Sequence, residues 1–217
     1  AGPAPGTAVV LCLGLLLEAL LAARRHERPP PFPMVWPLVP LQQLHARLQQ
    51  ALWSRQTACV VCPTRAAVSA VLHYGERLGA RVCDLARLQV QVSLAKSTTL
   101  EAARALLREE LRGAIASGSS LLLALGEAPP DVGGFCGPGQ APAEMFDFEK
   151  LDEVAGSLGL GPAAPGFHVV VLAQASKAQA EKQLPPRVPG FDDMAAMVLD
   201  PASLPPPPGP QEAATTP

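Results

Sequence analysis

Apolar runs and helical periodicity alternate along this chain, and the alternation predicts an α/β domain. The most apolar run, residues 119–125, shows no polar alternation, which is typical of a strand buried on both faces of a parallel sheet. The predicted strands are residues 58–62, 81–85, 119–125, 167–173 and 194–199. Apolar residues at three- and four-residue steps predict the helices between them. The predicted helices are residues 41–53, 64–78, 98–117 and 144–158.

Three ends of the predicted helices carry recognisable capping signals. Thr98 is expected to cap its helix through the hydroxyl, with Glu101 three residues later completing a capping box. Gly79 and Gly118 are placed to end the helices that precede them.

The N-terminal segment has a different character. Residues 7–23 are almost wholly apolar and are followed by the basic cluster that begins at Arg24. Two interpretations stay open: a helix buried against the domain, or a membrane anchor. The run is at the short limit for a span and contains Glu18, which is costly in lipid, so the buried helix is favoured.

Composition divides the chain into one domain and two flanks. The 25 prolines of the 217 residues crowd into residues 29–40, 129–142 and 201–217. We therefore expect a helix and proline-rich connection over residues 1–40, an α/β module over 41–200, and a disordered tail over 201–217. The chain does not begin with methionine, and we expect it to be part of a longer polypeptide. Its net charge of −2, with dispersed Lys and Arg, argues against a nucleic-acid surface.

The five cysteines do not form a disulfide or metal-binding pattern. Cys59 and Cys62 make a CxxC, but positions three apart in a strand point to opposite faces. Neither a second CxxC nor an HExxH accompanies them, so we expect buried cysteines in a reducing compartment and no metal site.

The turn after the 58–62 strand occupies the position of a phosphate loop. Such a loop needs GxxxxGK[ST], because its glycines let backbone N–H groups surround phosphate, its lysine neutralises charge and its hydroxyl binds magnesium. The corresponding frame here is Cys62, Pro63, Thr64, Arg65, Ala66, Ala67, Val68 and Ser69. Only Ser69 agrees with the motif, and Val68 stands where the cation is needed. The sequence predicts no catalytic residue, no bound cofactor and no hydrolysis at this turn.

A second hydrolytic position follows the 119–125 strand. Metal-bound nucleotide needs a carboxylate at the strand end and a neighbouring glutamate to activate water. The chain offers Glu127 alone, displaced past Gly126. This acidic position is therefore also predicted to be degenerate. A divergent nucleotide-binding domain, such as a small P-loop kinase, stays open as an alternative.

Four segments, in order, resemble one known family. They are Gly6 to Arg25, Cys62 to Leu85, Leu107 to Asp131, and Pro165 to Val188. Together they are similar to the fifth AAA+ module of dynein heavy chains: its leading helix, degenerate loop, helix–Gly–strand–Gly-Glu segment, and sensor strand with the proline segment after it. The proline content looks more like the members linked to sperm flagella than a working axonemal motor.

The resemblance implies a P-loop NTPase-like (AAA+) parallel sheet that performs no chemistry of its own. The expected role is structural: packing in a motor-type ring that supports microtubule-based movement, in the cytoplasm and the cilium or flagellum. The implied partners are neighbouring AAA+ modules of the parent chain and other dynein-complex subunits. Neither nucleic acid nor a membrane is an expected partner, although a membrane-anchored interaction protein is the alternative if residues 7–23 span a bilayer.

Overall fold

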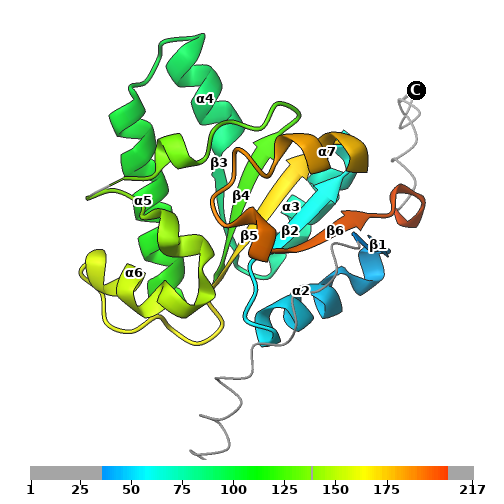
Figure 1. Ribbon diagram of the computed structural model, residues 1–217, viewed down its shortest axis with the longest axis horizontal. Helices are drawn as coiled ribbons and strands as arrows, with labels where there is room; N and C mark the ends of the chain where they lie inside the picture. The colour runs from blue at the N-terminus through cyan, green and yellow to red at the C-terminus, as the bar shows by residue number, and fades with distance from the viewer. Residues whose placement is uncertain (1–35, 138, 205–217) are drawn as a thin grey trace, which may run out of the picture. The chain divides into compact units, whose positions relative to one another are not determined.

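The computed structural model describes residues 36–137 and 139–204, which belong to one compact unit, Met34–Pro217 (Figure 1). The predicted N-terminal helix at residues 7–23 lies outside the described residues, as does the tail from residue 205 onward.

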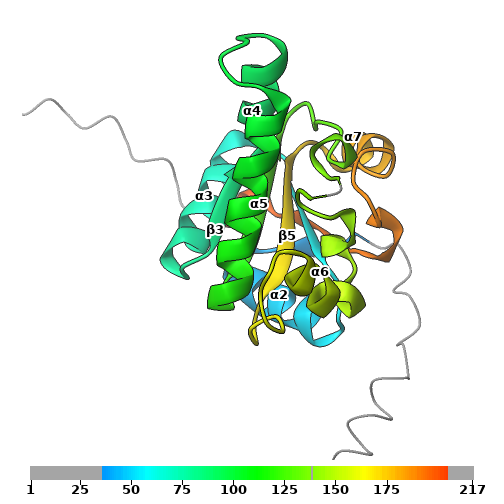
Figure 2. The ribbon, with the colours of Figure 1, turned by 90° about the vertical axis from the view of Figure 1, so that its left-hand side faces the viewer.

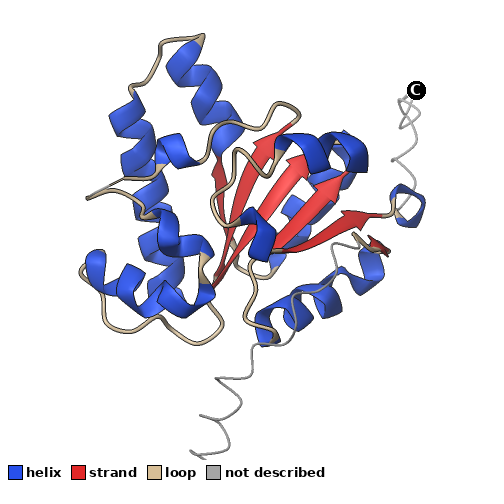
Figure 3. Cartoon of the chain, in the orientation of Figure 1, coloured by secondary structure: helices blue, strands red, loops and turns tan. Residues whose placement is uncertain are grey.

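Within that part of the chain, six strands form one all-parallel sheet in the order β1-β6-β2-β5-β4-β3 (Figure 3). The strands are β1 (Leu38–Val39), β2 (Ala58–Cys62), β3 (Arg81–Asp84), β4 (Ser120–Gly126), β5 (His168–Gln174) and β6 (Ala195–Leu199). The five predicted strands are confirmed to within one residue at each end. β1 is new, since residues 29–40 were predicted to be only an extended connection. The prediction of an α/β fold with a parallel sheet is confirmed.

Helices cover both faces of the sheet, as Figures 1 and 2 show. The helices are α2 (Leu44–Trp53), α3 (Arg65–Arg77), α4 (Leu85–Ser93), α5 (Leu100–Ser117), α6 (Leu151–Ser157) and α7 (Lys177–Gln183). Short 3-10 turns join them: η1 (Leu41–Gln43), η2 (Gly133–Phe135), η3 (Ala143–Phe146), η4 (Phe148–Lys150), η5 (Phe191–Asp193) and η6 (Pro201–Ser203). α2 and α3 pack on one face, and α4 to α7 pack on the other.

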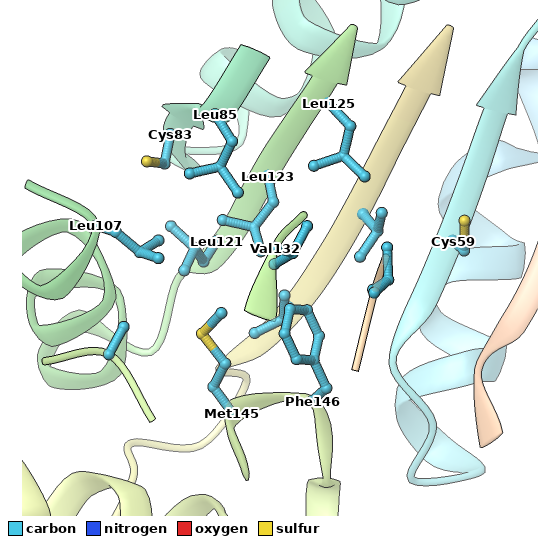
Figure 4. Close-up of a cluster of buried hydrophobic side chains, with 14 of the residues drawn as sticks. Cys59, Cys83, Leu85, Leu107, Leu121, Leu123, Leu125, Val132, Met145 and Phe146 are labelled. Carbon is cyan, nitrogen blue, oxygen red and sulfur yellow. The ribbon is translucent and has the colours of Figure 1, made fainter. Parts of the chain in front are cut away.

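Two apolar clusters fill the space between the sheet and these helices. The α5-side cluster includes Leu107 of α5 with Leu121 and Leu123 of β4, all fully buried (Figure 4). Leu111 of α5 is also fully buried in this cluster. The α3-side cluster includes Ala67 and Val71 of α3 with residues of β2, β5 and β6. Successive strand side chains alternate between the faces, so the apolar strands β2, β4 and β5 contribute residues to both clusters.

The two cysteines of the CxxC separate as predicted. Cys59 belongs to the α5-side cluster and Cys62 to the α3-side cluster, and both are fully buried free thiols. Burial raises the pKa of each to about 12. Both sulfurs are therefore protonated at neutral pH. Only the thiolate is a good nucleophile or metal ligand, so these thiols behave as small apolar groups.

Two helix predictions need correction, and two helices were missed. Residues 144–158 do not form one helix: Asp147 takes an extended conformation and its carboxylate accepts a hydrogen bond from Glu149 N, which separates η3 from η4 and α6. The helix predicted to start at Thr98 is capped by Thr99, whose hydroxyl accepts from Ala102 N at 3.1 Å. Glu101 is therefore not the capping-box partner. α4 and α7 were not predicted.

Candidate functional site

The carboxyl edge of the sheet, where β2, β4 and β5 end, is the place at which this topology can form a site. β2 and β5 are neighbours, but β2 leads into α3 on one face and β5 leads into α7 on the other (Figure 1). Open parallel sheets bind ligands in the crevice outside the strand ends where connections diverge in this way.

The turn between β2 and α3 is too short to surround a phosphate. β2 ends at Cys62 and α3 begins at Arg65, so only Pro63 and Thr64 lie between them. The Thr64 hydroxyl accepts a hydrogen bond from Ala67 N at 3.2 Å and caps the helix. Consequently, one of the first N–H groups of α3 is already satisfied by the protein.

The remaining frame residues lie on α3, with different surroundings. Ala67 is fully buried, and Val68 is half-buried against the α3-side cluster. Arg65, Ala66 and Ser69 are exposed. The frame therefore brings no cation other than Arg65 to the helix N-terminus, and Val68 contributes packing instead of charge.

Direct hydrogen bonds join the strand ends across the crevice. Ala175 N donates to Cys62 O at 3.1 Å, which continues the β2–β5 pairing past the last strand residue. Gln174 Nε2 donates to Glu127 Oε1 at 2.6 Å and joins the ends of β5 and β4. Glu127 is thus an exposed carboxylate that accepts a bond from an amide.

Two residues at this edge escaped sequence analysis. Gln174 was not predicted to have a role, although it is the last residue of β5. Ser176 forms a full capping box with Gln179 and starts α7. The Ser-x-x-Gln spacing was the available signal, and it was missed because α7 carries almost no apolar face.

A polar pair, buried His168 and half-buried Ser120, lies at the opposite, amino edge of the sheet. His168 Nδ1 donates to Gly166 O at 2.8 Å, and its Nε2 shares a hydrogen bond of 3.1 Å with the Ser120 hydroxyl. Both ring nitrogens are satisfied in the charged form, in which the Ser120 hydroxyl accepts from Nε2, and in the neutral form with the proton on Nδ1, in which it donates. Burial lowers the pKa of His168, which favours the neutral form, while the bond to Gly166 acts in the opposite direction.

Over residues 36–137 and 139–204, no three His, Cys, Asp or Glu side chains are grouped as metal ligands would be. In the same ranges, the helices are too short or too polar to span a bilayer.

Comparison with known proteins adds no assignment. The chain matches no family of protein domains, and no curated protein is significantly similar to it in sequence.

Proposed function

We propose that this chain is a non-hydrolysing, structural AAA+ module of a dynein-heavy-chain-like protein, which packs among neighbouring modules of a ring. The observation that carries the proposal is the carboxyl edge itself. A two-residue turn stands at the phosphate-loop position, Val68 packs where a cation is needed, and Glu127 hydrogen-bonds to Gln174. An all-parallel sheet with helices on both faces is compatible with a P-loop-like fold.

Under this proposal the module contributes shape and contact surface, and any nucleotide chemistry belongs to other modules. Binding of a fluorescent ATP analogue and magnesium-dependent ATP turnover of the purified chain test the absence of chemistry. We expect neither saturable binding nor turnover. Turnover that disappears in Ser69→Ala would refute the proposal.

The ring part needs a separate test. If the chain is one module among several, its transcript continues into further coding sequence on both sides. A complete transcript that encodes this domain alone would rule out the ring role while leaving the non-hydrolysing assignment intact.

A further inference from the structure

Helix α4 is apolar on two opposite sides. Leu85 and Leu88 face the core and are buried. Arg87, Val90 and Leu94 lie on the opposite side, because residues separated by three, four and seven positions share one helix face. We call these three residues the outer stripe of α4. Leu94 is in the helical conformation, and its N–H donates to Val90 O.

The outer stripe is well exposed. Val90 is 50% and Leu94 is 77% exposed, and Leu100, at the start of α5, is 37% exposed. Figures 1 and 2 show α4 and its connection to α5 extending past the arrowheads of the strands. A helix with apolar residues on both sides is expected to pack against a second partner, since only its inner side meets the part of the domain that the structure describes.

The charge around the stripe identifies the chemistry of that partner. Residues 84–104 contain the cations Arg87, Lys96 and Arg104 and the carboxylates Asp84 and Glu101, and the Asp84 carboxylate caps α4 by accepting from Arg87 N. Arg104 is committed to Gly134 O, to which Nε and Nη2 donate at 3.0 and 2.7 Å. Arg87 and Lys96 are exposed next to the apolar positions. An apolar strip bordered by cations complements an apolar strip bordered by carboxylates.

We propose that the outer stripe of α4 is a docking surface for an amphipathic helix of a neighbouring domain, whose apolar side chains are flanked by Asp or Glu. Two helices that meet in this way bury Val90 and Leu94 between them, and Arg87 faces the partner's carboxylates at the rim. The inference names the kind of partner for the packing role proposed above, and it rests on that role.

A peptide of defined design tests the proposal. The probe is a fluorescein-labelled Ala-based peptide of about 18 residues, long enough to form a helix in water, with leucines on one face and glutamates beside them. A matched peptide carries lysine in place of each glutamate. Titration of the full chain, followed by fluorescence anisotropy, should give saturable binding of the glutamate peptide and at least about tenfold weaker binding of the lysine peptide.

Variants show whether binding occurs at α4. Leu94→Gln should weaken binding by about tenfold, and Arg87→Glu should reverse the preference between the two peptides. Leu78→Gln, at another leucine that is 58% exposed, is the matched control and should bind normally.

Three results would overturn the proposal: no binding of the glutamate peptide, equal binding of both peptides, or binding unaffected by Leu94→Gln. Binding to vesicles rich in anionic lipid, without peptide binding, would also overturn it and assign the stripe to a membrane surface. Because ATP turnover is measured separately, failure here does not imply failure of the non-hydrolysing assignment.

Discussion

Gly118→Ala should destabilise the domain more than Gly79→Ala, although both glycines follow a helix and have a left-handed conformation. The φ values are +69° at Gly118 and +74° at Gly79. An alanine in this region costs about 1–2 kcal/mol. Gly79 has open space around an added Cβ, whereas a Cβ on Gly118 would lie 2.6 Å from the backbone oxygen of Pro165. A backbone atom cannot rotate away, so an overpacking cost of about 1–3 kcal/mol is added at Gly118 alone.

Urea unfolding of both variants measures this difference. We expect a loss of about 1–2 kcal/mol for Gly79→Ala and about 2–5 kcal/mol for Gly118→Ala, with unchanged m-values. The two glycines share conformation and residue type, so the difference reports the close approach between the end of α5 and the loop before β5. Equal losses would refute the reasoning, because they would show that this loop yields without cost.

Three further predictions concern the core, a cap and pH. Leu123→Ala should lower the free energy of unfolding in urea by about 2–5 kcal/mol, because Leu123 is fully buried. Leu94→Ala, at an exposed position, should change it by less than about 0.5 kcal/mol. Similar losses in the two variants would contradict the assigned burial. Thr99→Ala should cost about 1 kcal/mol and Thr98→Ala almost nothing, and the reverse order would restore Thr98 as the cap. The pKa of His168 is lowered by folding, so the unfolded chain binds the extra proton and stability should decrease as pH falls below about 6.5. In His168→Gln that decrease should be smaller, as measured by thermal unfolding between pH 5 and pH 8; an unchanged slope would exclude His168 as its source.

Strand positions were predictable because β2, β4 and β5 are buried on both faces and consist of nearly uninterrupted apolar residues. α4 was not predicted because Val90 and Val92 alternate with glutamines, a two-residue period that hides the helical spacing of Leu85 and Leu88. Packing against the rest of the domain, and not the local sequence, determines that this segment is a helix and not a strand. It places Val92 against the α5-side cluster and leaves Val90 outside.

The helix predicted over residues 144–158 failed for a local reason. Its apolar spacing is compatible with a helix, but Asp147 offers its carboxylate to the N–H of Glu149 and so competes with the helical hydrogen-bond pattern. At the candidate site, the missing lysine and glycines could be read from the sequence. The length of the turn and the Gln174–Glu127 bond could not, because they depend on where β2 ends and on which strands become neighbours.

Both edge strands of the described sheet are very short, which limits pairing with strands of other chains. A row of free backbone N–H and C=O groups invites pairing with another chain. Here β1 provides only Leu38–Val39, and β3 only Arg81–Asp84, whose terminal residues are charged. Arg81 Nη1 lies 3.1 Å from Glu110 Oε2 in an ion pair, and the Asp84 carboxylate accepts a hydrogen bond from Arg87 N. The domain can thus contain strands as apolar as those of an amyloid-forming peptide, because its short edge strands offer few free backbone groups for fibre growth.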